Sequence, residues 1–405
     1  MINAVIPFLL LPILVRYLDP AEYGEVALFT VWTSLISAIC GLSVQSSANR
    51  KYFDDKTGEF ELPQFIFSCL IILTLSSIAV FVVVYSLRTQ ISALLNFSTE
   101  WILLGIPFAY CSFLIQLRLG QWQVRDLAGN FAVFNISKAI TNASLSVVLV
   151  VFFAMGGGGR IGSMTTANML FAAVAIYLLK KDGLIKIAWR PDLIKEALRY
   201  GVPLVPHILG SFLLVTVDRA VISSVLGIDQ AGVYMVAVQV AAVVALGLDA
   251  VNKAFMPWLF NKLSQQDSAA KSEVVKLTYK YYFILVVGVL ISFIIADDVL
   301  MILASDAYSD AANVVAWIIL AQALRGAYLM VTNYVFYEKR TELVAAITIS
   351  TGIINVVLVY LFTDLYGLKG AAWAFCISMT IQWIATWYLA HKIHPMPWRM
   401  GFGRN

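Results

Sequence analysis

Long apolar runs separated by short polar segments recur along the whole sequence, and they restrict the fold more than any other feature. A helix of about 20 apolar residues crosses the ~30 Å hydrocarbon core of a bilayer, and few of these runs contain an interior charge. The alternating segments of ~10 residues that an outer-membrane barrel requires are not found in the sequence. The pattern predicts an all-α polytopic membrane protein with about twelve transmembrane helices. The predicted spans are 2–17, 24–48, 65–87, 101–122, 131–153, 161–179, 200–226, 233–252, 279–296, 311–336, 343–362 and 368–390.

The composition agrees with lipid as the solvent for most of the chain. Hydrophobic residues make up 60% of the 405 residues and charged residues 13%, against about 45–50% and about 25% in soluble domains. A soluble core stops growing near ~250–300 residues, so it could not bury this much apolar surface. The four cysteines lie far apart inside apolar runs, which favours small buried hydrophobes over a disulfide scaffold. A net charge of +4 is too small to indicate nucleic acid as a partner.

Lysine and arginine are distributed unequally between alternate connections. One set of connections holds 20 of the 28 basic residues. The opposite set holds four, namely Arg16, Arg88, Arg160 and Lys369. Because loops rich in Lys and Arg stay in the cytoplasm, the first set and both termini are predicted to be cytoplasmic. The acidic segment 297–310, which has no Lys or Arg, then lies outside. The basic set comprises 49–64, 123–130, 180–199, 253–280, 337–342 and the tail after residue 390.

The first apolar run is shorter than the others, and Pro7 and Pro12 interrupt it. It lacks the basic n-region and the small-residue cleavage site of a signal peptide. Either a thin, kinked first helix or a Met1 placed downstream of the true start would account for these features.

The two halves of the sequence can be superimposed at a shift of 208 residues. At this shift Gly24 faces Gly232 and Gly162 faces Gly370, each near the start of a span. Six helices per half is an even number, so the repeats are parallel and related by an axis along the membrane normal. The pattern predicts two six-helix lobes with a cavity between them, suited to alternating access. The predicted units are an N-terminal lobe over 1–179, a cytoplasmic linker over 180–199, a C-terminal lobe over 200–390 and a cytoplasmic tail over 391–405.

The linker between the lobes is basic and amphipathic. It holds six basic residues, and in a helix the apolar Leu193 and Ala197 would lie opposite Lys195. Such a pattern is typical of an interfacial helix on the cytoplasmic leaflet. A solvated connection that follows the positive-inside rule would have the same composition.

Six charged residues are candidates for charges buried in the membrane, where each costs about 2.5–3.5 kcal/mol on insertion scales. Charges in such places usually face a partner or a water-filled cavity. Adjacent helical residues point about 100° apart, so we expect that Asp218 and Arg219 cannot neutralise each other and meet charges on other helices or a ligand. Asp249 has Lys253 one helical turn away as a candidate partner. The candidates are Arg118, Lys138, Asp218, Arg219, Asp249 and Arg325.

The signs of these charges indicate the cargo. Without Asp249, which lies at a span end, four cations stand against one carboxylate, and a cavity with that excess favours an anion. Lys138 also forms a polar stripe with Asn135 and Asn142 at helical spacing. Structural alternatives remain open: an ion pair between helices for the 218–219 residues, and snorkelling to the interface for the arginines near span ends.

No pattern of catalytic, metal-ligating or phosphate-loop residues is present in the sequence. The three histidines are scattered, and Gly156–Gly159 lacks the Lys-Ser/Thr that follows in a phosphate loop. No connection exceeds roughly 30 residues, which leaves no room for an extramembrane catalytic domain. An enzyme, such as a membrane polymerase or a glycosyltransferase, is therefore not expected.

Several segments resemble one family in their order and spacing. Residues 16–24 (RYLDPAEYG) are similar to its first external turn, 195–204 (KEALRYGVPL) and 232–234 to its seventh and eighth helices, and 367–372 to its last external turn. The family is that of the bacterial polysaccharide-biosynthesis flippases, the Wzx-type O-antigen transporters of the multidrug/oligosaccharidyl-lipid/polysaccharide exporter (MATE-like) superfamily. Its members usually carry about half a helix more before the first turn, a departure that concerns the first span.

The resemblance implies an inner-membrane flippase. It would move undecaprenyl-pyrophosphate-linked oligosaccharide repeat units from the cytoplasmic to the periplasmic leaflet for O-antigen, capsule or exopolysaccharide synthesis. Implied partners are the lipid-linked oligosaccharide, membrane lipids, a polysaccharide polymerase and a chain-length regulator. No cofactor or metal is implied beyond coupling to protons or sodium.

Roles for the charged residues follow from this resemblance. Arg219, Arg118, Arg325 and Lys138 would hold the pyrophosphate or an acidic sugar. Asp218 would orient Arg219 or, with Asp249, take part in ion coupling. The alternative is a MATE-type cation-coupled multidrug antiporter of the same superfamily, which would need intramembrane carboxylates to bind cations; the sequence offers only these two aspartates.

Overall fold

The computed structural model describes residues 2–54, 61–265 and 267–398, and the elements in these ranges are helical. Local capping explains several helix starts. The Asp19 carboxylate accepts a hydrogen bond from the Glu22 amide at 2.8 Å, and the Glu22 carboxylate accepts from the Asp19 amide at 3.1 Å, which forms a capping box. The first half comprises α1 (Ile2–Tyr17), α2 (Pro20–Ile39), η1 (Cys40–Ser43), α3 (Val44–Asp54), α4 (Leu62–Leu95), α5 (Thr99–Val124), α6 (Ala128–Ser146), the π-helix η3 (Val147–Phe152) and α7 (Gly156–Lys181).

The second half begins with a helix outside the main bundle. The single span predicted over 200–226 is broken, because the chain turns at Thr216 and Val217 between α9 and α10. The elements are α8 (Pro191–Gly201), η4 (Val202–Leu204), α9 (Val205–Val215), α10 (Asp218–Leu226), α11 (Ile228–Ser264), α12 (Ser268–Leu303), η5 (Asp306–Ala311), α13 (Ala312–Tyr337) and α14 (Thr341–Ile393).

Ten helical segments in the described ranges are long and apolar enough to cross a membrane. The last of them, α14, has 53 residues and contains both spans predicted over 343–362 and 368–390. It bends at Gly367, whose φ of 63° and ψ of −146° suit glycine. A shorter apolar segment, Phe8–Tyr17, lies in α1. The helices therefore correspond to the twelve predicted spans, and the predicted fold class is confirmed.

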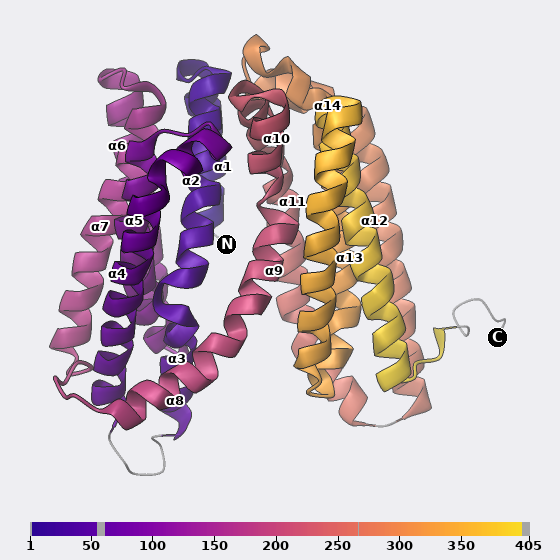
Figure 1. Ribbon diagram of the computed structural model, residues 1–405. Coiled ribbons are helices and arrows are strands. Elements are labelled where there is room, and N and C mark those ends of the chain that lie inside the picture. Colours follow the sequence, from indigo (N-terminus) through magenta and orange to yellow (C-terminus); the bar gives the residue numbers. More distant parts are fainter. Residues whose placement is uncertain (1, 55–60, 266, 399–405) are drawn as a thin grey trace.

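The helices form two groups that lie side by side (Figure 1). The N-terminal group contains α1–α7, and the C-terminal group contains α9–α14. At the lower end of the view, α8 runs beneath the N-terminal group and leads through η4 into α9. We call the end of the bundle with Asp19 and Gly227 the outer end, and the end with α8 the inner end, following the predicted sidedness.

The hydrophobic core is shared by the two groups at the outer end and divided at the inner end. Leu11 of α1 and Tyr23 of α2 belong to the same buried cluster as Tyr234 of α11. Towards the inner end, one cluster that includes Leu193 belongs to the N-terminal group and α8, and another that includes Tyr334 belongs to the C-terminal group. The groups are thus joined at the outer end and separate towards the inner end, as Figure 1 shows.

Two close backbone contacts between α2 and α11 hold the groups together at the outer end. A Cβ at Gly24 would overlap the carbonyl oxygen of Ile228, and a Cβ at Gly232 would overlap that of Pro20. Pro20 and Ile228 are 208 residues apart, and so are Gly24 and Gly232. The two contacts therefore exchange when the halves are exchanged, which places a pseudo-two-fold axis between α2 and α11.

The linker contains a helix, α8, whose apolar face is covered by protein. Leu193 is 2% exposed and Ala197 is fully buried, in the same cluster as apolar residues of α3 and α4. The Ser47 hydroxyl of α3 donates a hydrogen bond to the Ala197 carbonyl at 2.9 Å. The helix is therefore fixed to the N-terminal group, and the chain crosses to the C-terminal group through η4.

Sidedness can be tested by thiol labelling in a chain whose four native cysteines are replaced. Cysteine in place of Asp306 in η5 is expected to react with a membrane-impermeant thiol reagent added outside the cell. Cysteine in place of Ser268, at the start of α12, should react only after permeabilisation, because the inner end is predicted to be cytoplasmic. Both side chains are exposed, so labelling reports the side of the membrane. The reverse pattern would invert the predicted orientation.

Candidate functional site

The six predicted intramembrane charges do not gather in one place but are distributed between the two groups. Arg118 of α5 is 2% exposed, and its guanidinium carbon lies 4.1 Å from the ring centroid of Trp122. It pairs with the carboxylate of Asp182, which follows the last turn of α7. Arg118 therefore ties α5 to α7 near the inner end, and Asp182 neutralises its charge there.

Lys138 of α6 faces α7 and finds a neutral partner. Its ammonium donates to Oδ1 of Asn168 at 2.8 Å. The amide nitrogen of Asn168 in turn donates to the carbonyl of Phe108 at 2.9 Å and to the hydroxyl of Ser112 at 2.8 Å, both on α5. Among the residues that the structure describes, no ion pair includes Lys138. Its positive charge is thus compensated only by oxygen dipoles.

Arg160 is a buried cation that the sequence analysis counted with an external connection. It is 8% exposed and donates to Oδ1 of Asn142 at 3.0 Å and to Oγ of Ser146 at 2.6 Å, both on α6. Because α7 begins at Gly156, Arg160 already lies one turn inside the helix. The polar stripe of α6, which requires partners on a neighbouring helix, was the signal that could have located it. We call Lys138, Asn142, Ser146, Arg160, Ser163 and Asn168 the α6–α7 polar seam.

Asp218 and Arg219 are 3% and 8% exposed, and the expectation that they cannot neutralise each other is wrong. Nη1 of Arg219 lies 2.9 Å from Oδ1 of Asp218 and donates to the carbonyl of Val215 at 2.5 Å. The 100° rule applies to two residues inside a regular helix, whereas Asp218 starts α10 directly after the turn at Thr216 and Val217. The arginine side chain folds back toward that turn and reaches the carboxylate.

Asp249 of α11 pairs with Arg325 of α13 rather than with Lys253, the partner that helical spacing suggested. Nη2 of Arg325 lies 2.9 Å from Oδ1 of Asp249. The two side chains are 29% and 38% exposed, so this pair is more accessible than the 218–219 pair. It joins two helices of the C-terminal group.

An excess of positive charge remains after these pairings. Three of the predicted cations, Arg118, Arg219 and Arg325, each have a carboxylate partner. Lys138 and Arg160 have neutral hydrogen-bond partners. Of these cations, the two of the α6–α7 polar seam are therefore the ones without a carboxylate partner among the described residues. The seam adjoins the outer contact, because α7 begins against α2: a Cβ at Gly157 would lie 2.7 Å from the carbonyl oxygen of Glu22. At the next residue of α2, the Tyr23 hydroxyl donates to Gln239 of the other group at 2.7 Å.

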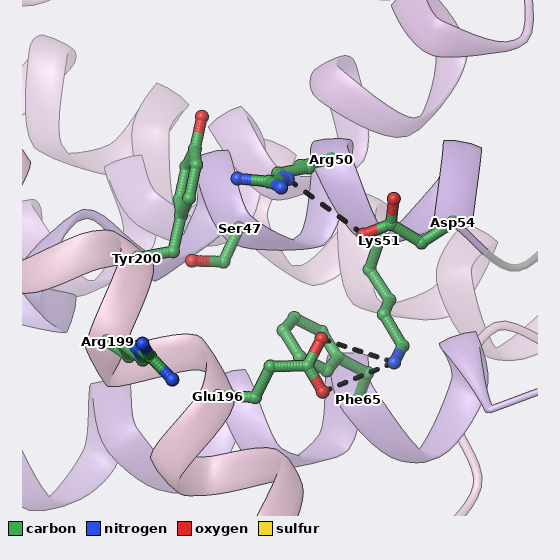
Figure 2. Close-up of a pocket in the computed structure, with 8 residues that line it drawn as sticks. All are labelled: Ser47, Arg50, Lys51, Asp54, Phe65, Glu196, Arg199 and Tyr200. Carbon is green, nitrogen blue, oxygen red and sulfur yellow. Dashed lines mark hydrogen bonds and ion pairs between the residues drawn. The ribbon is translucent and has the colours of Figure 1, made fainter.

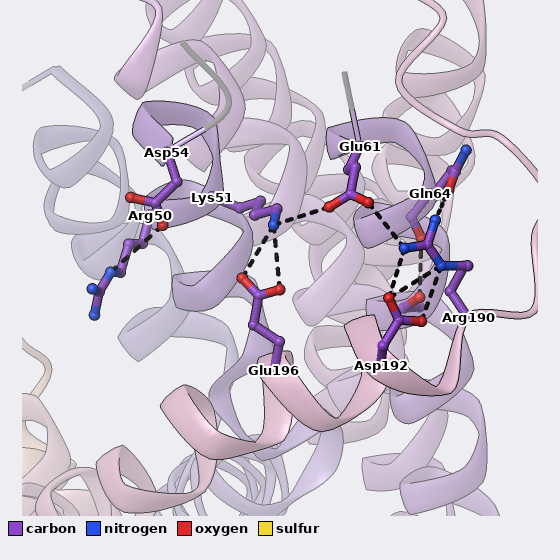
Figure 3. A network of polar contacts seen from close by, with 9 residues as sticks. Arg50, Lys51, Asp54, Glu61, Gln64, Arg190, Asp192 and Glu196 are labelled. Carbon is purple, nitrogen blue, oxygen red and sulfur yellow. Dashed lines mark hydrogen bonds and ion pairs between the residues drawn. The ribbon is translucent and has the colours of Figure 1, made fainter. Parts of the chain in front are cut away.

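A second concentration of charge lies at the inner end, where α8 meets α3 and α4 (Figure 3). Lys51 lies 3.2 Å from Glu196 of α8 and 3.4 Å from Glu61. Arg190, just before α8, pairs with Asp192 at 2.6 Å and with Glu61 at 2.9 Å. Hydrogen bonds to these two carboxylates raise the pKa of Arg190. Glu61 thus links both cations, and the network fastens α8 to the N-terminal group.

Two helical groups that share a core at one end of the bundle have a fold similar to those of MurJ and of MATE proteins. The solved structure "Lipid II flippase MurJ, inward closed conformation" matches with a TM-score of 0.78 and 14% identity, covering 96% of this chain and 85% of that one. "Inward-facing conformation of a multidrug resistance MATE family transporter of the MOP superfamily" matches with a TM-score of 0.76 and 14% identity, covering 96% and 94%.

The sequence itself shows the family. Residues 1–263 match the family described as "Polysaccharide biosynthesis protein", and the chain belongs to this family. It is also 23% identical over 363 residues to "Lsg locus putative protein 1" of Haemophilus influenzae, which covers 87% of this chain and 86% of that protein. The resemblance drawn from the ordered sequence segments is therefore confirmed.

Proposed function

We propose that this chain is a flippase of the bacterial inner membrane that moves undecaprenyl-pyrophosphate-linked oligosaccharide repeat units from the cytoplasmic to the periplasmic leaflet. Its product would supply surface polysaccharide synthesis, with a polymerase and a chain-length regulator as downstream partners. Membership in the polysaccharide biosynthesis family and the MurJ- and MATE-type fold support this proposal. The observation that carries it is the core, which is shared at the outer end and divided at the inner end. Alternating access from the inner side requires such an arrangement.

The distribution of charge fits an anionic cargo. A diphosphate that leaves water without compensating cations incurs a penalty of several kcal/mol per charge. The α6–α7 polar seam supplies Lys138 and Arg160, and Arg325, which is 29% exposed, can turn from Asp249 toward an anion. We propose that these three residues and Arg219 contact the diphosphate or an acidic sugar during the cycle. The burial of Arg118 beside Asp182 supports a structural role for that residue.

A cation-coupled multidrug antiporter of the same fold is the second candidate, supported by the likeness to a MATE transporter. Such a protein would bind its cations at intramembrane carboxylates. Asp218 and Asp249 each lie 2.9 Å from an arginine nitrogen, so neither carboxylate is left uncompensated. The charge distribution therefore favours the flippase. If transport is coupled to protons or sodium, these two aspartates are the proposed coupling residues.

Deletion of the gene is expected to leave lipid-linked repeat units on the cytoplasmic leaflet and to remove the surface glycan, because no route would carry the diphosphate across the bilayer. Sensitivity to cationic dyes should not change. Extraction of lipid-linked oligosaccharides, staining of surface polysaccharide and dye-inhibition assays measure the three quantities. A deletion strain with intact surface polysaccharide and heightened dye sensitivity would show the antiporter instead.

A further inference from the structure

A cavity of about 300 Å³ lies at the inner end between α3 and α8, apart from the intramembrane charges described above (Figure 2). Arg50 and Lys51 of α3 line one side, and Glu196, Arg199 and Tyr200 of α8 line the other. At ~30 Å³ per water molecule the cavity has the volume of about ten waters, enough for a small polyanion. It stands beside the start of η4, where the cores of the two groups are divided.

The carboxylate that α8 contributes to this cavity is already neutralised. Nζ of Lys51 lies 3.2 Å from both oxygens of Glu196, as Figure 2 shows. Lys51 is also held from the other side by Glu61, at 3.4 Å. Neither Lys51 nor Glu196 is therefore available to a ligand as a free charge, and both instead fix α8 in place.

The two arginines of the cavity, Arg50 and Arg199, differ from Lys51 in that neither has a close carboxylate partner among the described residues. The guanidinium carbon of Arg50 lies 5.1 Å from the ring centroid of Tyr200, and this cation–π contact orients it across the cavity. Its ion pair with Asp54 is long, 3.9 Å, and both side chains are more than half exposed, so the pair contributes little. Arg199 is exposed and makes no ion pair within the described part of the chain. Asp54 also lines the cavity. One guanidinium from each wall, Arg50 and Arg199, is nevertheless left without a short contact to a carboxylate of the described residues.

We propose that this cavity binds a lipid-borne diphosphate at the inner end, between Arg50 and Arg199, before it passes between the lobes. The proposal rests on the flippase function proposed above and names a binding site for its cargo. Guanidinium groups present pairs of N–H donors that match phosphate oxygens, which a lysine cannot do. Since Arg50 comes from α3 and Arg199 from α8, a diphosphate would bridge the N-terminal group and the linker helix.

Binding can be measured by thermophoresis with the purified full chain in phosphatidylcholine nanodiscs, with farnesyl diphosphate as the probe. Arg50→Ala and Arg199→Ala should each weaken binding about tenfold, because each removes a charge-assisted contact. Arg50→Lys should also weaken it, since the charge stays but the paired donors are lost. Lys195→Ala removes an exposed charge from the same helix outside the cavity and should leave the affinity unchanged. Equal weakening by Lys195→Ala, or none by the arginine variants, overturns the site.

The source of the phosphate is tested by changing the bilayer. In nanodiscs that contain phosphatidylglycerol, farnesyl diphosphate should still bind. Loss of its binding there would show a site for bulk anionic phospholipid and overturn the assignment to the cargo. If the deletion strain accumulates lipid-linked repeat units while the arginine variants bind farnesyl diphosphate as well as the parent chain does, the proposed binding site is overturned and the proposed flippase function is left intact. If the arginine variants bind farnesyl diphosphate more weakly but the deletion strain does not accumulate lipid-linked repeat units, the proposed flippase function is overturned.

Discussion

Replacing Gly232 by valine is expected to abolish export while the chain remains in the membrane. The added side chain would overlap the carbonyl oxygen of Pro20 and lie 2.8 Å from the amide nitrogen of Gly24, so the outer contact could not close. Overpacking of this kind costs about 1–3 kcal/mol, which corresponds to a shift of about fivefold to about 150-fold away from the outward-closed state. By the pseudo-two-fold relation, Gly24→Ala should act in the same direction.

Accessibility of Gln239, which bonds to Tyr23 across the two groups, reports the state of this contact. In a cysteine-free background, cysteine in place of Gln239 should react with an impermeant thiol reagent from the outer end in the Gly232→Val chain. It should not react, or react slowly, when Gly232 is present. Gly247→Val is the matched control. Gly247 lies on the same helix, α11, and a Cβ there would have no neighbouring atom of the described residues within 4 Å. Normal export and an unreactive cysteine in the Gly232→Val chain would refute the role of the contact.

Arg219→Ala is the second change with a large expected effect, namely loss of export. It leaves the Asp218 carboxylate, 3% exposed, without its cation. Breaking a buried pair on one side destabilises by about 3–5 kcal/mol, so the amount of protein in the membrane is expected to fall as well. Export assays and immunoblots of membranes measure the two effects.

A double variant separates function from stability at this pair. Asp218→Asn with Arg219→Leu removes both charges and should restore the protein level, because no uncompensated charge stays buried. Export should remain absent if Arg219 contacts the cargo. Restored export would show that the pair is structural alone. The control is the double variant Arg118→Leu with Asp182→Asn, which removes both charges of the other pair in the same way. This variant should support export at a normal level.

Hydropathy and length were enough to predict the helices, because lipid requires each crossing segment to satisfy its own backbone hydrogen bonds. The same requirement did not locate the turn at Thr216 and Val217, where α9 ends and α10 begins. Both residues are apolar or nearly so, and nothing in a hydropathy window distinguishes them from the surrounding span. The error about Asp218 and Arg219 follows from that missed turn, since their geometry was argued for an unbroken helix.

Positions of single charges were less predictable than the fold. Arg160 was counted with the connection between the spans predicted over 131–153 and 161–179, yet α7 starts at Gly156. Lys253 was a local candidate for Asp249, whereas the partner, Arg325, is 76 residues away in the sequence. Contacts between helices that are distant in the sequence depend on tertiary packing, and spacing along a single helix cannot predict them. By contrast, the 208-residue shift matched Gly24 with Gly232, and each of these two glycines lies against a backbone carbonyl of the other half.

The three-residue η4 is the short connection by which α8, held on the N-terminal group, continues into α9 of the C-terminal group. A tether this short keeps the two halves of the outer contact at a high effective concentration after they separate. Reclosure is then intramolecular and involves little loss of chain entropy. The contact between α2 and α11 can therefore be weak and still re-form in every cycle. A weak contact is also one that the binding free energy of a single cargo molecule can reverse.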